Sequence, residues 1–299
     1  MKSHKLLVIC GPTAVGKSSL AVDLAQKFGG EVVSTDSRQV YRGLNIATGK
    51  IAVDEMQNVP HHLLNVADPK ENFSAADFKV LADKAVADIQ RRGKLPILCG
   101  GTGFYIQAVV DDLLLPEVEP NEQLREELSG RTTEELFSEL KDKDPRRAKE
   151  IDPDNPHRLI RALEIVSELG EVPRLQKRER FNTFQIGLDY TDKELKHRII
   201  RRTKQRFEDG MIEEAQNLYE NGLSLERMHE LGLEYSELAN YIEGKINKEE
   251  LFTNIVQSDW QYARRQRTWF RKDERINWFN PEKDRKDIEK QVDKFLKEK

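Results

Sequence analysis

The segment Gly11-Pro-Thr-Ala-Val-Gly-Lys-Ser18 is the part of the sequence best suited to hold a phosphate group. It matches the spacing G-x-x-x-x-G-K-[ST] and stands between a short apolar run, residues 5–10, and a helix-periodic segment. Backbone N–H groups of such a loop surround a phosphate, Lys17 adds a positive charge, and the Ser18 hydroxyl can ligate Mg²⁺. The pattern predicts a polyphosphate site and leaves open whether the ligand is a nucleotide.

Two parts that accompany such a loop in nucleotide hydrolases do not match here. The apolar run 95–99 continues into Gly100-Gly-Thr-Gly103 without a carboxylate for Mg²⁺, and Asn247-Lys-Glu-Glu250 lacks the final Asp of a guanine-binding motif. The nearby carboxylate at the end of a strand is Asp36. It could anchor a metal, cap its own loop, or act as a base beside the phosphate site.

The residues after Asp36 have a composition suited to base recognition. In Asp36-Ser-Arg-Gln-Val-Tyr41, Gln39 can read a base edge and Tyr41 can stack, although a structural loop explains the segment equally well. The turns Thr48-Gly-Lys50 and Gly100-Gly-Thr-Gly103 allow the backbone to approach a ligand closely. Each of these features is weak on its own.

The charge distribution is polarised, although the net charge is −4 and the pI is near 6.0. These averages argue against a nucleic-acid-binding protein. However, residues 193–206 hold seven Lys or Arg against one acid, and residues 263–272 hold five against none, whereas residues 117–150 are acidic. The two basic blocks predict either a groove for a polyanion or two solvated helix faces.

Two further segments place cations at helical spacing. His157, Arg158, Arg161 and Glu164 lie near one side of a predicted helix, where they form either a surface salt-bridge ladder or a binding face. The run Arg264-Arg-Gln-Arg-Thr-Trp-Phe-Arg271 mixes guanidinium groups with aromatic rings. That composition suits looped RNA, and equally suits a helix that buries its two aromatic rings.

Composition sets the broad class of the protein. The 299 residues are 37% hydrophobic and 34% charged, which indicates a folded, helix-rich protein, and no stretch approaches the ~20 apolar residues of a membrane span. We therefore expect a cytoplasmic protein without membrane contact. Cys10 and Cys99 are expected in buried strands, and they exclude a disulfide framework or a four-cysteine zinc site. His61 and His62 are expected in a loop.

The hydrophobic pattern predicts an α/β fold: a parallel sheet flanked by helices. Strands are expected at residues 5–10, 31–35 and 95–99, with helices at 17–28 and 75–92. After Pro116 the pattern is mainly helical, at 132–143, 156–169, 192–221 and 248–271. We predict a core at 1–116, a helical insertion at 117–175, and a C-terminal part at 176–299 that completes the core.

Five segments taken together resemble the bacterial tRNA dimethylallyltransferases, the IPP transferase family, over nearly the whole chain. These segments are Gly11–Ser18, Asp36-Ser-Arg-Gln-Val-Tyr-Arg-Gly-Leu-Asn-Ile-Ala-Thr-Gly-Lys50, Gly100-Gly-Thr-Gly-Phe-Tyr105, Asn155-Pro-His-Arg-Leu-Ile-Arg-Ala-Leu-Glu164 and Arg264-Arg-Gln-Arg-Thr-Trp269. The resemblance implies a P-loop NTPase-like fold with a helical insertion domain and C-terminal helices. Those helices would clasp the anticodon stem-loop of tRNA.

The implied reaction moves a dimethylallyl group from dimethylallyl diphosphate to N6 of the adenine immediately 3′ of the anticodon, with Mg²⁺. The resemblance makes Asp36 the base, places Thr13 and Lys17 at the diphosphate, and assigns Ser18 to the metal. The diphosphate loop is then Gly11, Pro12, Thr13, Ala14, Val15, Gly16, Lys17 and Ser18. The implied tRNA contacts are Asp36, Ser37, Arg38, Gln39, Thr102, Arg125, His157, Arg158, Arg161, Arg264, Arg265 and Arg267.

One segment departs from the family pattern. Leu231-Gly-Leu-Glu-Tyr-Ser-Glu237 has Ser236 where the family has a basic residue and Glu234 where it has glycine, and Arg227 is a candidate substitute cation. The other functions considered are a small-molecule P-loop kinase, an adenine-nucleotide prenyltransferase and a non-catalytic RNA-binding module. We expect a monomer.

Overall fold

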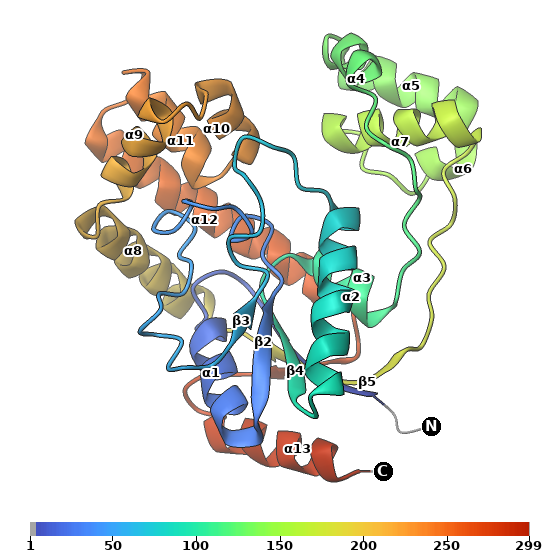
Figure 1. The fold of residues 1–299 in the computed structure, drawn as a ribbon. Helices are drawn as coiled ribbons and strands as arrows, with labels where there is room; N and C mark the ends of the chain where they lie inside the picture. The colour runs from blue at the N-terminus through green and yellow to red at the C-terminus, as the bar shows by residue number, and fades with distance from the viewer. Residues whose placement is uncertain (1–3, 299) are drawn as a thin grey trace. The chain divides into compact units, whose positions relative to one another are not determined.

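The structure, a computed structural model, describes residues 4–298 and divides into two compact units. The core unit comprises residues 1–112 and 179–299, and the inserted unit comprises residues 113–178. Figure 1 shows the sheet with its helices and the separate helical insertion. Within residues 4–298, no helix is both long and apolar enough to cross a membrane.

The core unit is built on a six-stranded parallel sheet with the order β3-β2-β4-β1-β5-β6. Strand β1 divides the sheet into two parts. Strands β2, β3 and β4 lie on one side of β1, and the strands that follow in the chain, β5 and β6, lie on the other side. Ligands of such sheets bind beyond the carboxyl ends of the strands at this point. The strands are β1 His4–Cys10, β2 Gly30–Ser34, β3 His61–His62, β4 Leu95–Cys99, β5 Phe181–Leu188 and β6 Ile276–Phe279.

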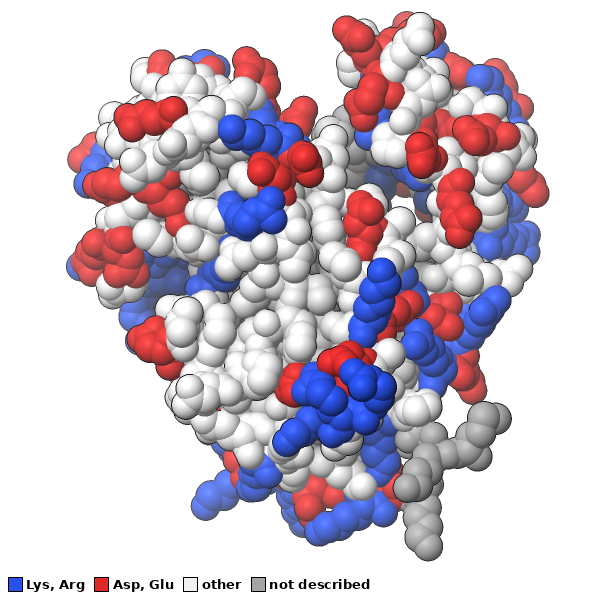
Figure 2. All heavy atoms as spheres, in the orientation of Figure 1, with Lys and Arg blue, Asp and Glu red and all other residues white. Residues whose placement is uncertain are grey.

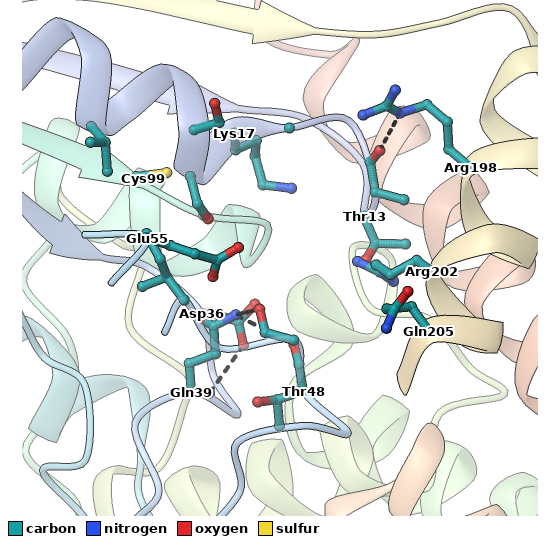
Figure 3. Close-up of a pocket in the computed structure, with 18 of the residues that line it drawn as sticks. Thr13, Lys17, Asp36, Gln39, Thr48, Glu55, Cys99, Arg198, Arg202 and Gln205 are labelled. Carbon is teal, nitrogen blue, oxygen red and sulfur yellow. Dashed lines mark hydrogen bonds between the residues drawn. The ribbon is translucent and has the colours of Figure 1, made fainter. Parts of the chain in front are cut away.

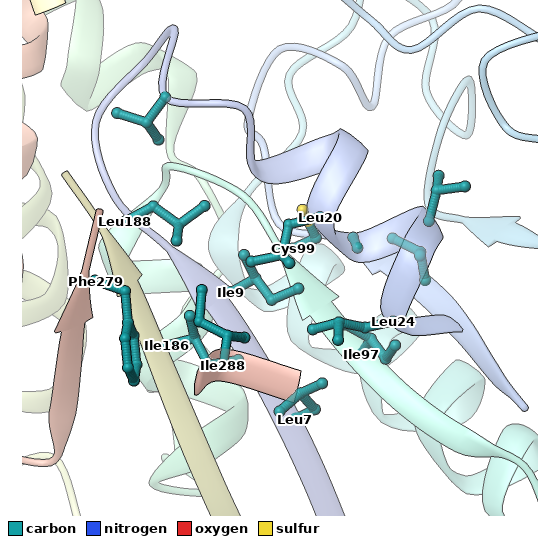
Figure 4. Packing of buried hydrophobic residues seen from close by; sticks show 14 of the residues in the cluster. Leu7, Ile9, Leu20, Leu24, Ile97, Cys99, Ile186, Leu188, Phe279 and Ile288 are labelled. Carbon is teal, nitrogen blue, oxygen red and sulfur yellow. The ribbon is translucent and has the colours of Figure 1, made fainter. Parts of the chain in front are cut away.

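Helices cover both faces of the sheet. Helices α1 (Lys17–Phe28) and α13 (Arg285–Lys297) contribute to one apolar cluster, and α2 (Ala75–Arg91) and α3 (Gly103–Val110) contribute to the other. Figure 4 shows the first cluster, in which Leu20 and Leu24 of α1 pack on strand side chains such as Ile9 and Ile97. Burying each such side chain contributes about 1.5–3 kcal/mol. This packing fixes the start of α1, which follows the P-loop.

Five C-terminal helices form a third apolar cluster in the core unit. They pack on Val40, Leu44 and Ala47, which belong to the chain after Asp36, and so hold that segment in place. The helices are α8 Asp192–Glu208, α9 Met211–Glu220, α10 Leu225–Leu231, α11 Glu234–Ile242 and α12 Lys248–Phe270.

The inserted unit has an apolar core of its own, which includes Leu136 and Leu140 of α5 and Leu159 and Leu163 of α7. Its helices begin at side-chain caps: Thr132 and Glu135 form a capping box. The helices are α4 Glu122–Ser129, α5 Thr133–Lys143, α6 Pro145–Ala148 and α7 Pro156–Leu169.

The predicted α/β class is confirmed, but the sequence pattern did not predict three of the strands, β3, β5 and β6. Polar residues interrupt β5, where Gln185 is buried between β1 and β6, and β6 has only four residues. The expected loop at His61 and His62 is wrong, because both residues pair with β2. The single helix expected at 192–221 is also wrong, because Gly210 adopts φ 94° between α8 and α9.

Candidate active site

A cavity of about 640 Å³ opens at the carboxyl ends of the strands in the core unit (Figure 3). The P-loop that follows β1, the chain after β2, and the Gly100 turn after β4 all contribute to its wall. The lining residues that the sequence analysis had singled out are Thr13, Ala14, Gly16, Lys17, Ser18, Asp36, Gln39, Thr48, Gly49, Cys99 and Gly100.

The P-loop is preformed. Gly11, at φ 138°, lies against the backbone of Leu188 in β5, and Gly16 adopts the left-handed conformation from which α1 begins. The Lys17 ammonium lies at the cavity, where it donates to the Pro12 carbonyl at 2.7 Å. Burial lowers the pKa of Lys17 to about 8. Because no carboxylate of residues 4–298 forms an ion pair with this ammonium, a bound anion would supply the missing negative charge.

Asp36 presents one carboxylate oxygen to the cavity. Its Oδ1 accepts hydrogen bonds from the backbone N–H groups of Arg38 at 2.9 Å and Gln39 at 3.3 Å, and Oδ2 receives no hydrogen bond from residues 4–298. Thr102 lies beside this turn, because its Oγ1 accepts from the Ser37 N–H at 3.0 Å. The Asp36 carboxylate is therefore held in place while one oxygen stays free to accept a proton.

The two side chains after Ser37 hold the loop. Arg38 Nε donates to the Leu231 carbonyl at 2.8 Å, which ties the loop to α10. Gln39 Nε2 lies 3.4 Å from the Thr48 carbonyl and 3.3 Å from the Gly49 carbonyl, so these two predicted segments meet at the cavity. Tyr41 is buried and is not among the residues that line the cavity.

Helix α8 supplies cations to the cavity that the sequence analysis did not assign to the diphosphate. Arg198, Arg201 and Arg202 line it together with Gln205, all from the first basic block. Arg198 Nε donates to the Ala14 carbonyl at 2.9 Å, which places α8 directly on the P-loop. The block indicated a polyanion site, but only the fold shows which of its members face it.

Gln266 of α12 also joins this site, although it was quoted only as part of a motif. It is buried, its Oε1 accepts from the Thr13 N–H at 2.8 Å, and its Nε2 donates to the Gly101 carbonyl at 3.0 Å. One side chain thus connects α12 to the P-loop and to the Gly100 turn.

The arginines of α12 have different surroundings. Arg264 and Arg265 are exposed, as a tRNA contact requires. Arg267 is buried and bonds to Asp189 at 2.8 Å, to Asp192 at 2.5 Å and to the Tyr190 carbonyl at 2.6 Å. Its expected tRNA contact is corrected, because these bonds make it an anchor between α12 and the chain before α8. In the aromatic pair of the same motif, Phe270 is buried and Trp269 is 37% exposed.

Arg227 does not replace the missing family cation at the cavity. Its guanidinium donates to the Pro69 carbonyl at 2.9 Å, the Glu71 carbonyl at 2.6 Å and Asn72 Oδ1 at 2.8 Å, and it does not line the cavity. It anchors α10 to the loop before α2.

Two of the four tRNA-contact residues expected in the inserted unit share one buried carboxylate. Glu164 is 1% exposed and accepts from Arg125 at 2.7 and 3.0 Å and from Arg161 at 2.7 Å. Burial raises the pKa of Glu164, but hydrogen bonds from the two arginines and from the Asn121 N–H outweigh it, so the pKa is lowered. His157 and Arg158 are exposed at the start of α7.

A divalent cation at Ser18 would need a ligand to bring further oxygens. Residues 4–298 contain no group of three His, Cys, Asp or Glu side chains arranged to hold a metal. The Ser18 hydroxyl and the Glu55 carboxylate do line the cavity, and Mg²⁺ usually takes one or two protein oxygens plus substrate phosphates. The donor set fits a metal carried by a diphosphate.

The surface seen in Figure 2 bears Lys and Arg in small groups among Asp and Glu, without one continuous basic area. The residues that line the cavity include four cations, Lys17 and three arginines of α8, together with the carboxylates of Asp23, Asp36 and Glu55. The four cations can attract a small, highly charged anion.

The fold and the cavity define a P-loop protein whose cavity is suited to phosphate groups and holds a loop carboxylate. The IPP transferase family model matches residues 39–273, and the chain belongs to this family. A tRNA dimethylallyltransferase of Anoxybacillus flavithermus is 41% identical over 283 residues, which cover 93% of this chain and 90% of the relative. One of Halalkalibacterium halodurans is also 41% identical, over 93% and 91% of the two chains.

Two solved structures of transferases that act on tRNA also match this chain. The tRNA isopentenylpyrophosphate transferase of Bacillus halodurans matches with a TM-score of 0.73 and 38% identity, over 98% of this chain and 97% of that one. A eukaryotic dimethylallyltransferase acting on tRNA matches with a TM-score of 0.81 and 28% identity, over 97% and 78%.

Proposed function

We propose that this chain transfers a dimethylallyl group from dimethylallyl diphosphate to N6 of the adenine immediately 3′ of a tRNA anticodon. Family membership supports tRNA prenylation. The observation that carries the chemistry is the free Oδ2 of Asp36 in the same cavity as the P-loop and Lys17. A carboxylate that can accept a proton thus lies beside a site that can accept a diphosphate.

The reaction needs both parts. The adenine amino group is a weak nucleophile, and proton transfer to the Asp36 carboxylate during attack makes it more reactive. The N6–C1 bond forms as the C1–O bond to diphosphate breaks, and the bonding electron pair leaves with the diphosphate. The N6 proton goes to Asp36. Lys17, the loop N–H groups and the arginines of α8 stabilise the negative charge that develops on the leaving group.

Three further residues complete the proposed site. Thr13, Gln39 and Ser18 line the cavity. Gln39 would face the flipped adenine, and Ser18 would hold Mg²⁺ that arrives with the diphosphate. Mg²⁺ would neutralise charge on the leaving diphosphate. Exposed Arg264 and Arg265 of the core unit and exposed His157 and Arg158 of the inserted unit are the proposed contacts to the tRNA backbone.

A label-transfer assay tests this proposal. The protein is incubated with Mg²⁺, labelled dimethylallyl diphosphate and unmodified tRNA, with tRNA lacking the target adenine, free AMP and a no-tRNA sample as controls. The proposal predicts label on the intact tRNA alone. Label on AMP would indicate a nucleotide prenyltransferase, and no label on any acceptor would contradict prenyl transfer.

A further inference from the structure

A buried ionic network lies behind the α8 wall of the cavity. It contains two arginines of α8, Arg202 and Arg206, one carboxylate of α12, Asp259, and one of α11, Glu234. Arg202 lies 2.9 Å from Asp259, Arg206 lies 3.0 Å from Glu234, and Asp259 Oδ2 is also 3.5 Å from Arg206. Ion pairs among these four side chains therefore connect helices α8, α11 and α12.

Arg202 connects this network to the cavity, because it also lines the cavity wall. The anion that holds it is Asp259, which is 1% exposed, and Arg202 makes no other ion pair among residues 4–298. A guanidinium with one buried carboxylate partner takes its position from that partner. Without the carboxylate, repulsion from Arg206 would favour a different position of Arg202.

Arg206 supports the part of the cavity wall that Thr48 and Gly49 form. It is 4% exposed, and a Cβ added to Gly49 would stand 2.6 Å from its Nη2, so the guanidinium lies directly against the Gly49 backbone. Gly49 and Thr48 line the cavity and accept the hydrogen bonds of Gln39. Glu234 thus acts on the site through Arg206, as Asp259 acts through Arg202.

Few hydrogen bonds hold the charged side chains of this network in place. Glu234 Oε2 and the Nε atoms of Arg202 and Arg206 are buried without a hydrogen-bond partner. Burial, followed by repulsion from Asp259, raises the pKa of Glu234. Because few bonds hold these charges, removing one carboxylate should move an arginine rather than be absorbed by the remaining contacts.

We propose that Asp259 is a positioning residue for the diphosphate, acting through Arg202, and that Glu234 supports it through Arg206. The proposal rests on the proposed function, because it takes the cavity to be the diphosphate site. It assigns a purpose to two buried carboxylates that do not themselves line the cavity.

Calorimetric binding of inorganic diphosphate with Mg²⁺ tests the proposal without requiring catalysis. Asp259→Asn keeps the shape and removes the charge, and it should weaken diphosphate binding about tenfold while leaving tRNA affinity unchanged. Glu234→Gln should weaken it less. Asp259→Glu, which keeps the charge, should recover part of the loss, and Glu249→Gln, at an exposed position of the same helix, should have no effect.

In the full reaction, Asp259→Asn should raise the KM for dimethylallyl diphosphate by the same factor with little change in kcat. Circular dichroism establishes that each variant is folded; if Asp259→Asn fails to fold, Asp259→Glu and Glu234→Gln carry the test. A folded variant with wild-type diphosphate affinity, or with equal losses for diphosphate and tRNA, would overturn the proposal. If the wild-type protein binds diphosphate tightly but prenylates no RNA, the proposed function is contradicted. The role of Asp259 in positioning Arg202 for diphosphate is then still supported by the binding data.

Discussion

Gln266 Oε1 lies 2.8 Å from the Thr13 backbone nitrogen, so a helix of the C-terminal cluster holds the P-loop by its main chain. The opposite end of the same amide donates to the Gly101 carbonyl at 3.0 Å. The two bonds have opposite polarity, and a side chain with both a donor and an acceptor is required at this position.

Replacement of Gln266 by Glu tests this requirement. A carboxylate keeps the size of the side chain but cannot donate to Gly101, so the loop should lose its position. We expect kcat/KM for dimethylallyl diphosphate to fall roughly 30-fold, which corresponds to about 2 kcal/mol. Gln261→Glu, at an exposed position of α12, is the control. Equal kinetics for Gln266→Glu and wild type would show that the bond does not matter.

The arginines of α12 should separate into two groups. The exposed pair, Arg264 and Arg265, should contribute to tRNA affinity and its salt dependence, so their joint replacement by Ala should reduce the salt slope by about two with an unchanged Tm. Arg267→Ala should instead destabilise the fold by about 3–5 kcal/mol, because it leaves the Asp189 carboxylate with fewer partners. Filter binding at several salt concentrations and thermal unfolding distinguish the groups. Unchanged stability of Arg267→Ala would refute its role as an anchor.

Catalysis should depend on the charge of Lys17. Burial lowers its pKa to about 8 in the free protein, so the ammonium is present below that pH and is lost as the pH rises through it. The kcat/KM for dimethylallyl diphosphate should therefore decline about tenfold per pH unit above pH 8.

Burial also lowers the pKa of Lys50 to about 8, and a pair of variants separates the two lysines. Lys50 donates to the Tyr41 carbonyl and does not line the cavity. A pH profile that keeps its decline in Lys50→Met and loses it in Lys17→Met, at a lower activity, is the expected result. The reverse pattern would rule out Lys17 as the titrating group.

Glu164 should stabilise the inserted unit. Glu164→Gln removes the charge that two arginines share, and we expect a loss of about 3 kcal/mol in its free energy of unfolding. Because the folded pKa of Glu164 is lowered, this stabilisation is complete at neutral pH and is lost as the pH falls through the folded pKa. Hydrogen exchange of the α7 amides measures it. Glu168 is exposed on the same helix, so the α7 amides of Glu168→Gln should exchange at the wild-type rate. If the α7 amides of Glu164→Gln also exchange at the wild-type rate, the prediction is contradicted.

Local sequence was sufficient for the elements that carry strong local patterns. The P-loop, the apolar strands beside it and the capped helices were predicted because apolar period and capping residues act over a few positions. Strand β5 was missed because the neighbours that bury its polar Gln185 are distant in sequence. The break at Gly210 was missed because the residues on either side continue the helical period.

The same limit applies to the site. Lys17 and Asp36 could be singled out because a motif and a strand end mark them. Gln266 and Arg202 could not be assigned, because their partners are the Thr13 amide and Asp259, which lie 253 and 57 residues away in sequence. Arg267 shows the opposite error: its motif suggested RNA, whereas the fold surrounds it with internal acceptors.

The most direct test of the account is single-turnover prenyl transfer to unmodified tRNA by wild type and Asp36→Asn, followed by mass analysis of the tRNA nucleosides. Asn keeps the Oδ1 that accepts from Arg38 and Gln39 but removes the carboxylate that accepts the proton. We predict dimethylallyl-adenosine from wild type and a rate at least ~100-fold lower for Asp36→Asn, with unchanged affinities for tRNA and inorganic diphosphate. Wild-type rates in Asp36→Asn would contradict the account.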